Sequence, residues 1–334
     1  MNTLIIAEIG VNHNGDLDLA KSLIRSAKES GADAVKFQTF TAESLVSAET
    51  PKVKYQKKTT LSDESHFEMI KSLELSKDYH YELFKYCSKV DIEFMSTPYD
   101  EESVFFLDDL GVQRFKTASA DIVDLMLHKA ISCTKKDVII STGMATYEEI
   151  DSAIGIYSDQ TKISLLHCVS NYPCSLESIN LNVMKSLKDR YNLEVGFSDH
   201  AESFAPSVAS IALGGTIIER HFTLNKDLPG PDHRASSTPE EFKHLVSLIR
   251  SAEISLGTYI KEVQAEEVEM RNISRKSLFY SKNIKKYDTL SEQPVCLKRP
   301  GTGLYAYNLK EIIGKKASDN FEKGMMIKKE DFSD

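Results

Sequence analysis

The sequence lacks several features that would assign a protein class at once. It has no run of about 18 apolar residues, so it predicts no membrane span. No basic-then-apolar leader precedes the strand-like start at Leu4, so we expect a cytoplasmic protein rather than an exported one. The five cysteines are an odd number and form no CxxC pair, which indicates free, reduced thiols.

The sequence also has no excess of positive charge. Lys and Arg number 41 against 50 Asp and Glu, a net charge of −9. Such an acidic chain is a poor candidate for general nucleic-acid or anionic-membrane binding. Residues 278–334 differ, with eleven Lys and Arg against eight Asp and Glu, so they carry +3 and the rest −12. A basic end could dock onto an acidic body, within one chain or between chains; ordinary surface variation is the alternative.

Short apolar runs alternate with longer amphipathic stretches over about 260 residues. The runs show little polar alternation, which is typical of strands buried on both faces of a parallel sheet. We expect strands at Leu4–Glu8, Ala34–Gln38, Ile92–Ser96, Arg114–Ala118, Asp137–Ser141, Lys162–Cys168, Glu194–Ser198 and Thr216–Glu219. Helical spacing appears at Leu17–Ala27, Tyr79–Ser88, Glu101–Leu110, Tyr147–Tyr157, Leu181–Leu187, Phe204–Leu213 and Phe242–Leu256.

Eight strand–helix units in this length predict an α/β fold, a (β/α)₈ TIM barrel. An open doubly wound sheet is the alternative, but the turn after the first strand, Glu8–Gly15, is not the glycine-rich GxGxxG of that fold. We therefore expect a barrel over residues 1–262, a charged linker over 263–277 and a small module over 278–334.

Polar residues stand at the carboxyl end of every expected strand, where a TIM barrel carries its active site. Eight polar ends together favour a site over isolated capping roles. The ends are Glu8, Lys36 with Gln38, Ser96-Thr97, Lys116 with Ser119, Ser141-Thr142, His167-Cys168, Ser198-Asp199-His200 and Glu219-Arg220-His221.

Two of these ends suggest a metal. His200 and His221 are 21 residues apart, one strand–helix unit, so they would stand on adjacent strands. Two neutral imidazoles make a plausible divalent-metal pair with positions left open for water or substrate. Glu219 would share the face of His221. Core histidines that are satisfied by hydrogen bonds are the alternative.

Lys36 and Lys116 point to an anionic ligand. With the hydroxyls of Thr97, Ser119 and Ser141 they suit a phosphate or a carboxylate. A lysine paired with an acid such as Glu8 and a Schiff-base lysine are alternatives. Cys168 could be a catalytic thiol, but its apolar neighbours favour a small buried side chain.

Together these segments resemble the sialic acid synthase family, whose members condense phosphoenolpyruvate with an N-acetylated mannose-type sugar. The matching stretches span nearly the whole chain in the family's order. They are Ala7–Gly15, Val35–Phe40, Ser96–Pro98, Ser141–Met144, Leu166–Cys168, Gly196–His200, Glu219–Thr223, Gly230–His233 and Lys298–Gly301.

The resemblance implies a barrel followed by a small antifreeze-like (SAF) domain. It implies a homodimer in which each small domain reaches the partner's barrel and brings Arg299 to the sugar. By position, His200 and His221 look like ligands of Mn²⁺ or Mg²⁺, and Glu8 is the candidate catalytic group that handles the reacting water. The implied phosphoenolpyruvate set is Lys36, Thr97, Lys116, Ser119 and Ser141, and the implied sugar set is Tyr172, Asp232, Arg299 and Ser170.

The chain departs from the family pattern at three places. Asp121 follows Ser119-Ala120 where many members have Ser-Gly-Glu, and Thr302 stands where many have Asn. Ser170 falls where some members have Asn. The segment Tyr55–Thr60 with Glu68–Ile70 looks like branches that make neuraminic or legionaminic acid, and less like the pseudaminic branch.

The expected function is N-acetylneuraminate synthesis from phosphoenolpyruvate and N-acetylmannosamine. The alternative is an N,N'-diacetyllegionaminate synthase that uses 2,4-diacetamido-2,4,6-trideoxymannose. A pyruvate Schiff-base aldolase acting through Lys36 or Lys116 and a non-catalytic binding protein are further alternatives.

Overall fold

The computed structural model describes residues 2–47, 49–52 and 64–333, so the segment Tyr55–Thr60 lies outside the described residues. The chain divides into two compact units, Met1–Gly257 and Thr258–Asp334. The second unit takes in the whole stretch expected as a linker, which contains helix α13 (Val268–Ser274).

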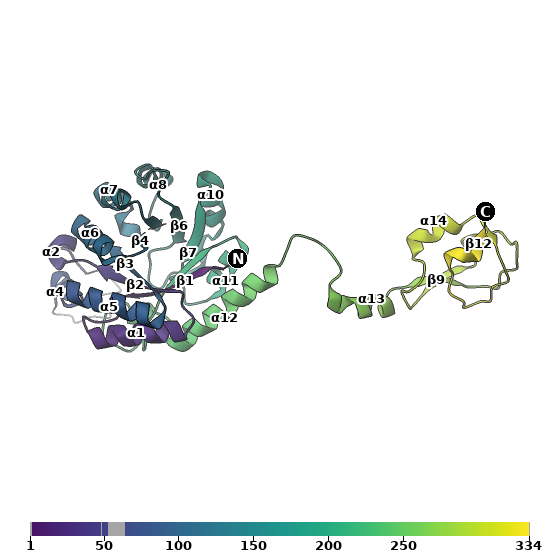
Figure 1. Ribbon diagram of the computed structural model, residues 1–334, viewed down its shortest axis with the longest axis horizontal. Coiled ribbons are helices and arrows are strands. Elements are labelled where there is room, and N and C mark those ends of the chain that lie inside the picture. The colour runs from purple at the N-terminus through teal and green to yellow at the C-terminus, as the bar shows by residue number, and fades with distance from the viewer. Residues whose placement is uncertain (1, 48, 53–63, 334) are drawn as a thin grey trace. The chain divides into compact units, whose positions relative to one another are not determined.

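The first unit alternates strands with helices, and the helices lie outside the strands (Figure 1). Its strands are β1 (Leu4–Gly10), β2 (Ala34–Thr39), β3 (Glu93–Pro98), β4 (Arg114–Thr117), β5 (Asp137–Ser141), β6 (Ile163–Cys168), β7 (Glu194–Ser198) and β8 (Ile217–His221). Its helices are α1 (Leu17–Glu29), α2 (Ala42–Leu45), α4 (His66–Ser72), α5 (Lys77–Val90), α6 (Glu101–Leu110), α7 (Leu125–Thr134), α8 (Tyr147–Ile154), α9 (Leu176–Ile179), α10 (Asn182–Tyr191), α11 (Ala205–Ala212) and α12 (Pro239–Leu256).

The eight strands form one sheet in the order β3-β2-β1-β8-β7-β6-β5-β4. Every hydrogen-bonded pair is parallel, and β3 contacts β4 to bring the ends of the sheet together. The TIM barrel is therefore confirmed. A bulge between Glu8 and Gly10 shifts the register of β1 against β2, and Gly10 takes a positive φ of 55° there.

Two apolar layers fill the unit. One lies between strands and helices, and the other inside the barrel. The inner layer has one residue from each of six strands: Ile6, Ala34, Met95, Ile139, Leu166 and Ile217. Because strand side chains alternate, the residues two positions further along share that inner face. They are Glu8, Lys36, Thr97, Ser141, Cys168 and Glu219, which stack above the apolar layer.

Helix α7 was absent from the expected elements. Asp124 caps it by accepting hydrogen bonds from the backbone N–H groups of Met126 and Leu127. Leu125 and Met126 are exposed, so the apolar stripe of this helix is blurred in the sequence. Helix α12 begins three residues before the expected Phe242, with Thr238 as N-cap, Pro239 in the first turn and Glu241 completing a capping box.

The second unit holds strands β9 (Ser277–Tyr280), β10 (Val295–Lys298), β11 (Lys316–Ala317) and β12 (Phe332–Ser333) and helices α13 and α14 (Leu309–Ile312). The pairs β9–β10 and β11–β12 are antiparallel. Tyr280 stacks on Phe321 at the centre of its own small core. None of the helices formed by the described residues has the length and apolar character to cross a bilayer.

Candidate active site

A pocket opens at the carboxyl ends of the barrel strands. Eleven of the twelve expected site residues line it: Glu8, Lys36, Thr97, Lys116, Ser119, Ser141, Ser170, Tyr172, His200, His221 and Asp232. The twelfth, Arg299, belongs to the second unit, where its Nε donates a hydrogen bond to the Ser274 carbonyl at 3.0 Å. Its expected role at a partner's sugar site stays a prediction.

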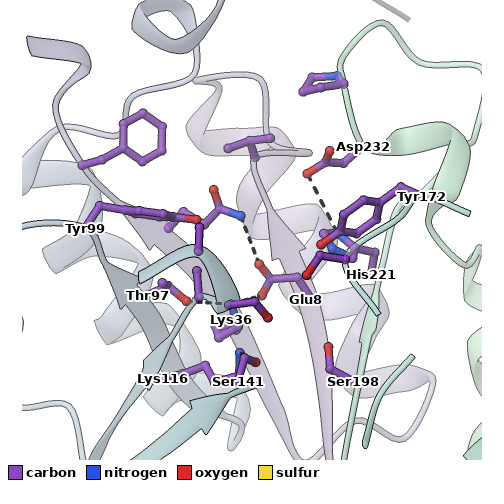
Figure 2. A pocket seen from close by; sticks show the side chains of 18 of the residues that line it. Glu8, Lys36, Thr97, Tyr99, Lys116, Ser141, Tyr172, Ser198, His221 and Asp232 are labelled. Atoms are coloured by element: carbon purple, nitrogen blue, oxygen red, sulfur yellow. Dashed lines mark hydrogen bonds and ion pairs between the residues drawn. The ribbon is translucent and has the colours of Figure 1, made fainter. Parts of the chain in front are cut away.

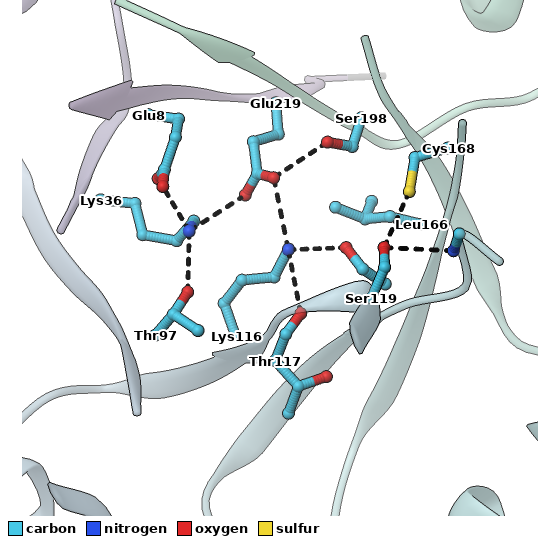
Figure 3. Close-up of polar contacts among 12 residues, drawn as sticks. Glu8, Lys36, Thr97, Lys116, Thr117, Ser119, Leu166, Cys168, Ser198 and Glu219 are labelled. Atoms are coloured by element: carbon cyan, nitrogen blue, oxygen red, sulfur yellow. Dashed lines mark hydrogen bonds and ion pairs between the residues drawn. The ribbon is translucent and has the colours of Figure 1, made fainter. Parts of the chain in front are cut away.

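At the base of the pocket, two lysines and two glutamates form a buried group that we call the charged floor: Glu8, Lys36, Lys116 and Glu219 (Figure 3). Lys36 Nζ lies 2.7 Å from Glu8 Oε2 and 3.9 Å from Glu219 Oε2. Lys116 Nζ lies 3.3 Å from Glu219 Oε1. Register explains the pairing, because Glu8 is opposite Lys36 on β2 and opposite His221 on β8.

Hydroxyl groups complete the surroundings of both lysines. Lys36 donates to Thr97 Oγ1 at 2.7 Å, and Lys116 donates to Ser141 Oγ at 2.6 Å. This is the cation-and-hydroxyl set that the sequence indicates for an anionic ligand. Lys36 is also paired with Glu8, so the simpler alternative of an internal ion pair holds alongside it.

The two glutamates of the charged floor differ in acidity. Burial raises the pKa of Glu8 to about 7, although Lys36 opposes the rise. Burial alone would raise the pKa of Glu219 as well, but Lys116 and Lys36 bring it down to about 2. Glu219 is therefore a fixed counter-charge, whereas Glu8 can give and take a proton near neutral pH.

The ionisation of the lysines bears on the Schiff-base alternative. Burial alone would lower the pKa of Lys36, but Glu8 and Glu219 raise it. Burial lowers the pKa of Lys116. A Schiff base needs a neutral amine, so the structure disfavours that chemistry at Lys36.

The two histidines face each other at one side of the pocket, with ring centroids 5.7 Å apart. Burial lowers the pKa of His200, and burial with repulsion from His200 lowers the pKa of His221 to about 3. Both rings are thus neutral, as metal ligands must be.

Their hydrogen bonds also fit a divalent ion. The Val169 carbonyl lies 2.8 Å from His200 Nδ1, so this atom donates the proton and leaves Nε2 with a free lone pair. His221 Nδ1 is buried and makes no hydrogen bond among the described residues. In that part of the chain no group of three or more His, Cys, Asp or Glu could hold a metal. An ion here would take the two imidazoles, with water or substrate completing its shell.

Two of the expected sugar residues, Tyr172 and Asp232, lie beside His221 (Figure 2). The Tyr172 ring lies 4.2 Å from the His200 ring between centroids, and Asp232 Oδ2 lies 3.9 Å from His221 Nδ1. Burial raises the pKa of Asp232 to about 6. Ser170 lines the same pocket.

Ser119 and Cys168 meet beside the charged floor. Their Oγ and Sγ atoms are 3.0 Å apart, and the Gly143 backbone N–H donates to Ser119 Oγ at 3.2 Å. A Cβ at Gly143 would come within 2.5 Å of Ser170 Oγ and 2.7 Å of Cys168 Sγ, so only glycine fits. Burial raises the pKa of the Cys168 thiol, which keeps it protonated and disfavours a catalytic thiolate. All five cysteines are free, as expected.

Sequence reasoning left several pocket residues out of the expected site. Glu219 was assigned only to a strand end and the face of His221, although it contacts both lysines. Gln38 donates to Glu8 Oε1 at 3.3 Å, and Ser198 donates to Glu219 Oε1 at 3.0 Å. Alternation along the strands was the available signal, because each stands two residues after an inward position of its strand.

The side of the pocket opposite the two histidines is apolar. We call its lining the apolar wing: Phe40, Leu45, Met69, Ile70, Leu73 and Tyr99. These residues come from the connections after β2 and β3 and from helices α2 and α4. The family resemblance included Phe40, Met69 and Ile70 in its matching segments but gave none of the six a role.

Comparisons with known proteins give the relatives of this chain. Residues 23–261 match the NeuB family and residues 275–333 match the SAF domain. The chain is 45% identical to the N,N'-diacetyllegionaminic acid synthase of Campylobacter jejuni, covering 98% of this chain and 99% of that protein. It is 43% identical to the protein of the same name from Legionella pneumophila, covering 98% and 94%. The solved N-acetylneuraminic acid synthetase of Leptospira borgpetersenii superposes with a TM-score of 0.71 at 32% identity, covering 81% and 90%.

Proposed function

This chain belongs to the NeuB family and ends in a SAF domain, and from that premise we propose that it is an N,N'-diacetyllegionaminate synthase. It would condense phosphoenolpyruvate with 2,4-diacetamido-2,4,6-trideoxymannose and water and release phosphate. The observation that carries the choice of sugar is the identity of 45% and 43%, over nearly the full length, to two relatives of that name. The solved N-acetylneuraminic acid synthetase is 32% identical. The alternative substrate is thus better supported than N-acetylmannosamine, the sugar first expected.

The reaction makes one carbon–carbon bond. C3 of phosphoenolpyruvate bonds to the aldehyde carbon of the open-chain sugar, and the aldehyde oxygen takes a proton to become a hydroxyl. Water then adds to C2 of the former phosphoenolpyruvate and loses a proton. Collapse of this adduct breaks the bond between C2 and the phosphate oxygen, which leaves a nine-carbon α-keto acid and inorganic phosphate.

The charged floor is suited to hold phosphoenolpyruvate. Lys36 and Lys116 supply positive charge from the barrel interior, where exclusion of water strengthens their attraction for phosphate and carboxylate. Thr97, Ser119 and Ser141 add hydroxyl donors around them. Glu219 is the counter-charge that both lysines contact before the anion arrives.

Glu8 is the group to move protons in this reaction. It stands between Lys36 and the histidine side of the pocket, with its pKa raised by burial to about 7. A carboxyl that titrates near neutral pH can accept a proton from the attacking water and return one to the new hydroxyl.

His200 and His221 would hold Mn²⁺ or Mg²⁺, which supplies Lewis-acid polarisation of the sugar's aldehyde when bound. The protein's own part is to keep both rings neutral and to fix the His200 tautomer through the Val169 carbonyl. Tyr172, Asp232 and Ser170 line this side and would position the sugar's hydroxyl and acetamido groups.

The working form would be a homodimer that brings Arg299 to the partner's sugar. Its support is the basic charge of residues 278–334 against the acidic remainder. Mixing inactive His200→Ala with inactive Arg299→Ala should restore activity, because hybrid dimers then contain one site with both side chains. A fully active monomer, or no rescue after subunit exchange, would end this proposal.

Phosphate release tests the function directly. Purified enzyme with phosphoenolpyruvate and Mn²⁺ is given either 2,4-diacetamido-2,4,6-trideoxymannose or N-acetylmannosamine. We expect the higher kcat/KM with the diacetamido sugar and a nine-carbon keto acid by mass spectrometry. Phosphate release with neither sugar would refute the assignment as a synthase, and a preference for N-acetylmannosamine would refute the choice of sugar.

A further inference from the structure

The apolar wing lies across the charged floor from the histidines. Figure 2 shows Tyr99 on one side of Glu8 and Lys36, and Tyr172, His221 and Asp232 on the other. Phe40 and Tyr99 meet edge to face, with ring centroids 5.9 Å apart. Met69 and Leu73 are buried beside them, while Leu45 and Ile70 are half-buried. The wing is therefore a packed wall that faces the pocket.

A histidine side chain accompanies this wall. His66 lines the pocket from the start of α4, and Met69 and Ile70 lie three and four residues further on the same helix face. Its Nδ1 atom is buried and has no hydrogen-bond partner within the described part of the chain. Burial lowers the pKa of His66, so the ring is neutral and can make one ordinary hydrogen bond there.

The two candidate sugars differ at the end away from the aldehyde. The diacetamido sugar has an acetamido group at C4 and a methyl group at C6, where N-acetylmannosamine has two hydroxyl groups. Against apolar side chains, each hydroxyl would lose hydrogen bonds to water without replacement. An acetamido group and a methyl group instead offer two methyls to the wall and one amide to a polar partner.

From this match we propose that the apolar wing and His66 form the subsite that binds the C4 acetamido and C6 methyl end of the sugar. The assignment rests on the proposed function, because it places the aldehyde end at His200 and His221. It names the residues that distinguish a 6-deoxy, 4-acetamido sugar from N-acetylmannosamine. The charged floor, which holds the phosphoenolpyruvate, takes no part in that discrimination.

The test is the ratio of kcat/KM for the two sugars in single variants. Ile70→Gln places an amide in the wall, and His66→Leu removes the hydrogen-bonding atom while keeping bulk. Each should lower the ratio by about 10-fold, the range expected for a small apolar group in a matched pocket. Ile254→Gln is the matched control, because that isoleucine is 81% exposed on α12 and absent from the pocket lining.

The outcomes separate the two proposals. A fallen ratio in both pocket variants, with the ratio of Ile254→Gln unchanged, supports the subsite. If wild type prefers the diacetamido sugar but both pocket variants keep its ratio, the proposed function stands and the subsite is wrong. Equal losses for both sugars would place the shared C2 acetamido group at the wing and overturn the assignment. If the wild-type enzyme does not prefer the diacetamido sugar, the proposed substrate is wrong, and the subsite that rests on it is overturned with it.

Discussion

The two sides of the pocket are built from different parts of the barrel. The charged floor stands on strands β1, β2, β4 and β8, whose backbones are tied to their neighbours by parallel ladders. The apolar wing stands on connections and on the short helices α2 and α4. Connections tolerate change more readily than strands do. The difference supports our two proposals, in which the floor carries the chemistry and the wing carries the choice of sugar.

Removal of the divalent metal should have the largest effect and should not distinguish the sugars. Dialysis against a chelator is expected to abolish phosphate release with either sugar, and added Mn²⁺ should restore it. Mn²⁺ binding followed by electron paramagnetic resonance should weaken strongly in His200→Ala and remain in Ile70→Gln. Full activity of chelator-treated enzyme would contradict the assignment of His200 and His221.

Glu8→Gln tests the floor without changing its shape. We expect kcat to fall by about 10²–10⁴-fold, the usual contribution of general acid–base catalysis. The loss should be equal for both sugars, unlike the losses at the wing. Wild-type kcat should depend on pH near 7, because burial raises the pKa of Glu8 to about 7, and the variant should lose this dependence. A variant with unchanged kcat would remove Glu8 from the chemistry.

The anchoring of β8, which carries Glu219, can be tested at the next residue, on the outer face of the strand. Arg220 Nη1 lies 2.9 Å from Asp199 Oδ2, and both side chains are buried. Arg220→Met leaves the Asp199 charge buried without its cation, so the free energy of unfolding should fall by about 3–5 kcal/mol. Arg114→Met, which breaks a partly exposed pair with Glu93, is the control. Its expected cost in urea denaturation is about 1 kcal/mol or less. Equal costs would argue against a specially anchored floor.

The smallest expected effect lies at Asp121, outside both the floor and the wing. Burial and repulsion from Asp124 raise its pKa to about 7, and its Oδ2 has no hydrogen-bond partner among the described residues. A carboxyl whose pKa is higher in the folded protein stabilises the fold at low pH. That contribution is lost as the pH rises from about 4 to 7. Asp121→Asn should therefore raise the melting temperature at pH 8 and change it little at pH 4. A gain at pH 4 alone would reverse the argument.

Strand order and strand ends were predictable from the sequence because a parallel barrel buries continuous apolar runs and collects polar residues where they end. Seven of the main helices were expected as well, since their apolar stripes are clear. Helix α7 was missed because Leu125 and Met126 are exposed. The barrel was expected to end at residue 262, whereas the first compact unit ends at Gly257. Charged, helix-prone residues do not show in the sequence which of two units they pack against.

The sequence by itself determined which residues face the barrel interior. Strand alternation places Glu8, Lys36, Thr97 and Ser141 directly above the apolar layer formed by the residues two positions earlier. Only the tertiary structure decided which of them touch, because neighbours across a barrel depend on register and closure. That is why the contacts of Glu219 with both lysines, the Asp199–Arg220 pair and the gathering of the apolar wing with His66 appear only in the folded chain.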